Sequence, residues 1–132
     1  VEFEDIPVPI IGYIDLQYEG ITRDIKTTGR MMSKIPATIC RQLSLYGYAE
    51  DSVPYADFIH VTKAKAEVVT IEITDVENNV NELQRAALSM MNVLSYSDDI
   101  NQVASLYYPD FDDWRWSNGI DRDAAKKLWR IK

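Results

Sequence analysis

The sequence predicts an α/β fold in which a mixed central β-sheet is flanked by helices. Alternating apolar and polar residues mark four strand segments, at residues 10–18, 21–28, 55–63 and 67–74. Apolar residues with helical spacing lie between the second and third of these segments and again after the fourth. Strands interleaved with helices in this way are typical of an α/β domain.

The bulk composition is that of one globular domain. A chain of 132 residues, 46% hydrophobic and 27% charged, predicts a single domain over residues 1–132 with a real core. The one cysteine, Cys40, excludes an internal disulfide framework and any cluster built from several thiolates. No apolar run approaches the roughly 18 residues that span a bilayer, so a soluble, intracellular protein is expected.

The first two strand segments are expected to form a hairpin whose register follows from its turn. Glu19 and Gly20 make a two-residue loop, in which Gly20 tolerates a positive φ. On this register Tyr18 faces Ile21, and Asp15 faces Asp24. A longer loop would shift the facing pairs.

A helix is expected to follow the hairpin, from Ser33, which can cap it, to about Tyr48. Pro36 is tolerated because the amides of the first helical turn have no partners to lose. One face of this helix is expected to pack on the sheet and carries Ile35, Ile39, Gln42 and Tyr46. Further elements are expected as a short strand at residues 1–4 and as helices at residues 76–94, 97–107 and 121–129.

Two carboxylates and a lysine are expected to gather on one face of the hairpin. Facing side chains have Cβ atoms about 4.5–5.5 Å apart and like charges there are destabilising, so a cation between Asp15 and Asp24 removes the problem. Lys26 shares the face of Asp24, while Ile25 points the other way with its backbone carbonyl near the same edge. Two carboxylates and a carbonyl are hard oxygen ligands suited to Mg²⁺ or Mn²⁺. The alternative is a solvent-facing sheet surface on which Lys26 is an ordinary ion-pair partner.

Three short motifs occur in order on the expected strand, strand and helix. They are Gly12-Tyr13-Ile14-Asp15, Asp24-Ile25-Lys26-Thr27 and Gln42-Leu43-Ser44-Leu45-Tyr46. Together they resemble the ordered G-x-x-D, D-x-K and Q-x-x-x-Y signature of the RecB-type and phage exonuclease branches of the PD-(D/E)XK nuclease superfamily. A lone D-x-K would be weak evidence, whereas three motifs in order are much stronger.

The resemblance implies a restriction-endonuclease-like core and a role for each motif residue. Asp15 and Asp24 would bind metal, Lys26 would act on the water or the phosphate, and Gln42 and Tyr46 would help arrange the site and the nucleic acid. For Gln42 and Tyr46 the alternative is local hydrogen bonding in the core. The family usually carries an acidic or His residue on a helix before the first strand, so this first helix is expected to be missing from the chain.

The function implied is that of a Mg²⁺-dependent deoxyribonuclease, with an exonuclease favoured, that hydrolyses DNA phosphodiester bonds in recombination, repair or phage replication. DNA would be its partner, and the cytoplasm of a bacterial or phage-infected cell its location. A homo-oligomer or a larger recombination or replication assembly is also expected. Two alternatives stay open: a catalytically inactive nuclease-fold module that binds DNA or protein, and an acidic interaction domain unrelated to nucleic acids.

The net charge of −7 opposes binding to a polyanion, so the distribution of charge matters more than its total. Five basic residues gather in the first third of the chain, namely Arg23, Lys26, Arg30, Lys34 and Arg41. This asymmetry permits a local basic groove near the motifs.

Overall fold

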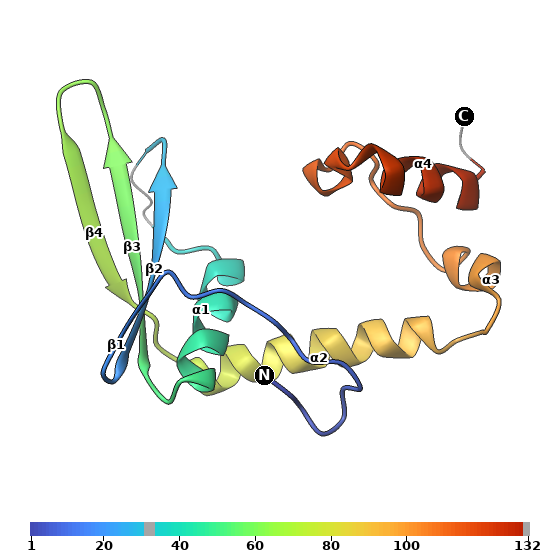
Figure 1. The fold of residues 1–132 in the computed structure, drawn as a ribbon, viewed down its shortest axis with the longest axis horizontal. Coiled ribbons are helices and arrows are strands. Elements are labelled where there is room, and N and C mark those ends of the chain that lie inside the picture. The colour runs from blue at the N-terminus through green and yellow to red at the C-terminus, as the bar shows by residue number, and fades with distance from the viewer. Residues whose placement is uncertain (31–33, 131–132) are drawn as a thin grey trace. The chain divides into compact units, whose positions relative to one another are not determined.

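The computed structural model describes residues 1–30 and 34–130, and it divides the chain into two compact units, Val1–Leu88 and Ser89–Lys132 (Figure 1). The first contains the sheet and all the motif residues, and the second is helical. Whether the two units make one domain, as expected from the length, stays a prediction.

A four-stranded mixed sheet forms the centre of the first unit, which confirms the α/β class. Its strands lie in the order β1 (Leu16–Tyr18), β2 (Ile21–Thr28), β3 (Val53–Val61) and β4 (Ala66–Glu72). β2 and β3 are parallel, while the two outer pairs are antiparallel. A parallel pair needs a crossover connection, and the helix between β2 and β3 supplies it.

Tyr18 pairs with Ile21 and Leu16 with Arg23 around a turn in which Gly20 has a φ of 71°, as the expected register requires. The ladder ends at Leu16 and Arg23, so the expected pair of Asp15 with Asp24 lies just beyond it. The expected start of the strand at Ile10 is wrong, since β1 begins only at Leu16. The strand expected at residues 1–4 is also not formed. The backbone groups of Val1 and Ile10 instead bond to each other and close a loop.

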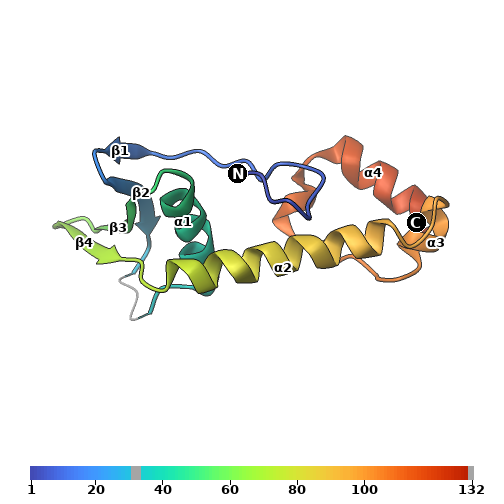
Figure 2. The ribbon, with the colours of Figure 1, turned by 90° about the horizontal axis from the view of Figure 1, so that it is seen from below.

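The crossover helix α1 (Ala37–Ala49) lies along one face of β2 and β3 (Figures 1 and 2). Pro36 is its N-cap and not part of its first turn, because the ψ of 139° at Pro36 is extended. The expected cap, Ser33, lies outside the described residues. The predicted stripe does face the sheet: Ile39 and Tyr46 pack with Leu43, Ala56 and Phe58 in the core.

The face of the sheet beneath α1 is the buried one. Thr22 and Asp24 of β2 point into it, together with Ala56 and Phe58 of β3. The interpretation of Asp24 as a solvent-facing residue is therefore wrong, because Asp24 lies under the helix. Ile25, on the opposite face, is exposed.

The ends of β3 and β4 lie one or two residues earlier than expected. Pro54 is tolerated inside β3, which therefore begins before Tyr55. β3 ends at Val61 because the next residue, Thr62, turns the chain: its hydroxyl accepts bonds from the amides of Ala64 and Lys65. The strand boundaries thus follow local turn chemistry.

Helix α2 (Val76–Leu94) has the expected bounds and continues from the first unit into the second. The second unit adds α3 (Ile100–Ala104), the 3₁₀ turn η1 (Trp114–Ser117) and α4 (Gly119–Leu128). Both α-helices depart from the expected bounds where a side chain caps them. Asp99 accepts from the amide of Asn101, and Asn118 from that of Ile120.

An aromatic cluster holds the second unit together. Phe111 lies against Trp116 and Trp129, with ring centroids 5.2 Å and 6.4 Å apart. The indole of Trp129 also contacts Tyr107 and donates a hydrogen bond to its backbone oxygen. These aromatic rings are therefore used in packing.

Candidate active site

Asp15 lies one residue before β1, and its carboxylate adds one hydrogen bond to β2 beyond the last backbone pair of the β1–β2 ladder. Its Oδ2 atom accepts a hydrogen bond of 2.8 Å from the backbone amide of Ile25. In an antiparallel pair the N–H and C=O groups of one residue point to the same side, so the Ile25 carbonyl also faces the edge where Asp15 lies. The carboxylate and the carbonyl are thus at the same edge of β2, as predicted.

Asp24 is buried, with 3% of its surface exposed, and it faces α1. Its Oδ2 atom lies 2.7 Å from Nζ of Lys26, which shares that face of β2 as the alternation predicts. Despite this short distance the buried Oδ2 atom accepts no hydrogen bond of ordinary geometry from the residues that the structure describes. The carboxylate is therefore compensated by charge but still has unused capacity as an acceptor.

Lys26 also connects to the helix. Its Nζ atom donates to Oε1 of Gln42 at 3.3 Å, and Nε2 of Gln42 donates to the hydroxyl of Tyr46 at 2.8 Å. These two bonds fix the amide with its carbonyl toward Lys26 and its NH₂ toward Tyr46. Asp24, Lys26, Gln42 and Tyr46 therefore form one continuous polar chain between the sheet and α1.

Gly12 explains why the first motif begins with glycine. A Cβ atom built at Gly12 would lie 2.4 Å from Cε1 of Tyr46, closer than real Cβ contacts. Only glycine lets the segment before β1 pass over the Tyr46 ring. All three motifs therefore meet around α1 and β2, and Asp15 joins them through the amide of Ile25.

The oxygen atoms at this edge of β2 are of the kind that hard divalent cations prefer. Among the described residues no three or more His, Cys, Asp or Glu side chains gather as a metal-binding group. Asp15 is exposed and Asp24 is buried, and each carboxylate, like the Ile25 carbonyl, is a hard oxygen donor of the kind that Mg²⁺ takes beside waters and substrate phosphate. The buried Oδ2 atom of Asp24, which is ion-paired with Lys26 but keeps unused capacity as an acceptor, is the observation that favours such a ligand.

The basic groove suggested by the sequence is largely neutralised. Arg23 points to the other face of the sheet, where its guanidinium forms two bonds of 2.8 Å and 2.7 Å with Asp57. Arg41 is paired with Glu82 at 2.9 Å. Arg30 and Lys34 have exposed side chains and continue the chain from β2 toward α1.

Sequence reasoning missed the network that Arg23 forms with Asp57. The guanidinium, together with the Thr70 hydroxyl, holds the pKa of the Asp57 carboxyl below its usual range, and Asp57 in turn raises the pKa of Arg23. β2 and β3 place Arg23 beside Tyr55 and Ile25 beside Asp57, so the contact is diagonal. The signal would have been the register of the parallel pair, which no local pattern supplies.

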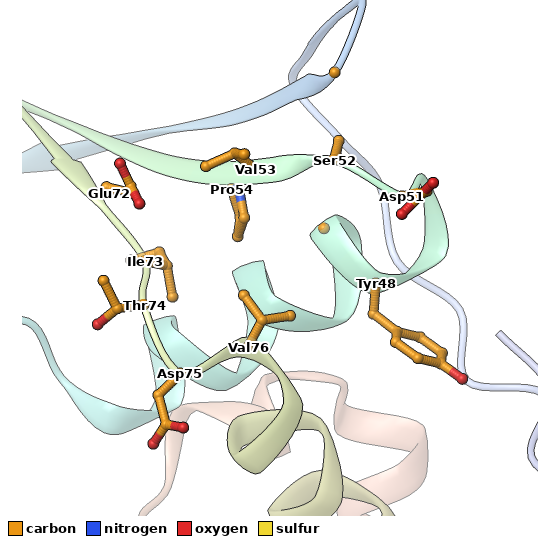
Figure 3. A pocket seen from close by; sticks show the side chains of 12 residues that line it. Tyr48, Asp51, Ser52, Val53, Pro54, Glu72, Ile73, Thr74, Asp75 and Val76 are labelled. Atoms are coloured by element: carbon orange, nitrogen blue, oxygen red, sulfur yellow. The ribbon is translucent and has the colours of Figure 1, made fainter.

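A pocket of about 700 Å³ lies elsewhere in the first unit, where β2 and β3 begin and β4 ends (Figure 3). Pro54, Ile73 and Val76 line its apolar part, and Figure 3 shows Asp51 and Asp75 pointing away from each other. No motif residue lines this pocket. Its volume therefore does not bear on the chemistry of Asp24 and Lys26.

Comparisons with family models, with curated proteins and with solved structures find no match to this chain. Within the part of the chain that the structure describes, no helix has the length and apolar character needed to cross a bilayer.

Proposed function

We propose that the chain carries the active site of a metal-dependent deoxyribonuclease with a restriction-endonuclease-like core, most simply an exonuclease of the PD-(D/E)XK type. The observation that carries this proposal is the polar chain from Asp24 through Lys26 and Gln42 to Tyr46. Its members come from two of the three motifs, and the third supplies Gly12 and Asp15 at its border. DNA would be the substrate, in the cytoplasm and within a recombination, repair or replication assembly.

The chemistry of each side chain determines the role proposed for it. Asp15 and Asp24 would hold Mg²⁺ or Mn²⁺ with the Ile25 carbonyl. When bound, the ion supplies charge that stabilises the phosphodiester and lowers the pKa of a water. Lys26, a donor without acceptor capacity, would orient that water or donate to a phosphate oxygen in the transition state.

Gln42 and Tyr46 would act as positioning residues. The Gln42 carbonyl keeps the Lys26 ammonium at the site, and Tyr46 keeps the Gln42 amide from rotating. Both polar groups sit in a half-buried region, where leaving a donor or acceptor unpaired costs about 1–3 kcal/mol. The arrangement therefore holds Lys26 in a narrow range of positions.

A catalytically inactive DNA-binding module is the second candidate. It is favoured by the ion pair of Lys26 with Asp24, which compensates the buried carboxylate without any metal. Cleavage separates the two candidates, because an inactive module would bind DNA and leave it intact.

The test is hydrolysis of end-labelled linear DNA with Mg²⁺ or Mn²⁺, beside a chelator control. Asp24→Asn and Lys26→Gln should each lower the rate at least a hundredfold, whereas Lys65→Gln, a change at an exposed lysine in the loop between β3 and β4, should not. DNA binding without cleavage by the wild type would favour the inactive module. If the protein neither binds nor cleaves DNA, both candidates are rejected.

A further inference from the structure

We propose that Lys26 is a resident competitor of the divalent cation: it occupies Asp24 in the metal-free protein and must be displaced to Gln42 when metal binds. This inference rests on the proposed metal site, and it concerns how that site is loaded. Lys26 would then control metal affinity as well as take part in the reaction.

The first step is the competition for Asp24. The carboxylate is 3% exposed, and its Oδ2 atom already has the Lys26 ammonium 2.7 Å away. A divalent cation at the same oxygen would place two positive charges side by side in a half-buried region, where their repulsion is only weakly screened. Metal binding at Asp24 therefore requires the ammonium to move.

The second step is the place to which the ammonium moves. Oε1 of Gln42 is 3.3 Å from Nζ of Lys26, a longer contact than the one with Asp24. Tyr46 holds the amide with this oxygen toward the lysine. Lys26 can thus shift from Asp24 toward Gln42 while it stays beside the site. The ammonium is then no longer bound to a carboxylate, and it is available to water or phosphate.

A consequence is that the two occupants exclude each other. In the absence of metal the lysine compensates the buried carboxylate. Such compensation is needed because an unpaired negative charge buried under α1 would be strongly destabilising. In the presence of metal the same lysine is released toward the substrate. The exchange therefore couples metal binding at Asp24 to the release of the Lys26 ammonium for contact with water or phosphate.

The experiment measures Mn²⁺ binding calorimetrically, without DNA, to the full chain. Lys26→Met should raise the affinity for Mn²⁺ about tenfold, because it removes a competing charge and keeps an unbranched side chain. Lys65→Met is the matched control: it makes the same change in net charge at a lysine paired with Glu67, away from Asp24. The control should change the affinity less than twofold. Asp24→Asn should abolish this binding and so assign it to the site.

A double-mutant cycle tests the role of Gln42. Gln42→Ala should weaken Mn²⁺ binding severalfold in the wild-type background, because the displaced ammonium loses its acceptor. In the Lys26→Met background the same change should have no effect. An equal loss in both backgrounds would mean that Gln42 acts on the metal site by some other route, and would overturn the exchange.

The outcomes separate this inference from the proposed function. Mn²⁺ binding that depends on Asp24, with Lys26→Met no tighter than the wild type, would overturn the competition and leave the metal site standing. No binding by the wild type and none by Lys26→Met would overturn both. Thermal melts of each variant under chelator identify any protein that has lost its fold.

Discussion

Gly12→Ala is expected to destabilise the first unit by about 1–3 kcal/mol, the usual cost of overpacking a site that is already filled. The added Cβ atom would lie 2.4 Å from Cε1 of Tyr46, and 3.1 Å from both the ring atom Cζ and the hydroxyl oxygen Oη. Tyr46 is buried and its hydroxyl holds Gln42, so the ring has little freedom to withdraw. Relief must therefore come from the backbone before β1 or from α1.

Urea unfolding followed by circular dichroism measures the change, with Gly29→Ala as the matched control. Within the described part of the chain a Cβ atom at Gly29 meets nothing within 4 Å, and the φ of Gly29 is not in the left-handed range. The control should be neutral or more stable by up to about 1 kcal/mol, because alanine reduces the entropy of the unfolded chain. Equal midpoints for the two variants would refute the close approach of Gly12 to the ring.

The clash can also be assigned to its partner. In a Tyr46→Leu background the ring is gone, so Gly12→Ala should cost much less than in the wild type. Independent, additive losses would show that the destabilisation arises from the backbone at Gly12 and not from Tyr46.

Three other predictions follow from buried polar groups. Asp24→Asn under chelator should destabilise by about 1–2 kcal/mol, less than for a fully buried pair because Lys26 keeps partial solvent access; a more stable variant in thermal melts would mean that repulsion from Asp15 outweighs the ion pair. Ser44→Ala should stabilise the fold by about 1 kcal/mol, because the buried Ser44 hydroxyl has no hydrogen-bond partner among the described residues. The gain should appear as a higher melting temperature. The lowered pKa of Asp57 means that its pair with Arg23 stabilises the fold above the carboxyl's unfolded pKa of about 4 and that this contribution is lost as pH falls through the folded pKa. Urea midpoints at pH 7 and pH 3 should therefore differ less in Asp57→Asn than in the wild type, and equal differences would contradict the linkage.

The features that were predicted correctly depend on short stretches of chain. The two-residue turn at Gly20 determines the pairing of Tyr18 with Ile21, and alternation along β2 puts Lys26 on the face of Asp24. Spacing on α1 likewise put Gln42 and Tyr46 on the side that faces the sheet. Such rules depend on residues that are close together in the chain, so they can be applied from the sequence alone.

The features that were missed depend on distant contacts. Val1 bonds to Ile10 in a segment where strands were expected, and no periodic pattern predicts this contact. Alternation shows which residues share a face but not which face α1 will cover, and so the burial of Asp24 was not evident. The partner of Arg23 depends on how two parallel strands align across the intervening helix. These features are set by tertiary contacts, which can override the secondary-structure preference of a short segment.

The polar chain beneath α1 is a stronger sign of function than the ion pair alone. Lys26 and Asp24 satisfy each other's charge, and a purely structural pair would require no further acceptor on the helix. Placing Gln42 and the Tyr46 hydroxyl there as well removes two more polar groups from water, which apolar side chains of similar size would avoid. Stability alone therefore does not account for the connection between sheet and helix. A requirement to hold the Lys26 ammonium in position, close to an acidic edge that also contains Asp15, does account for it.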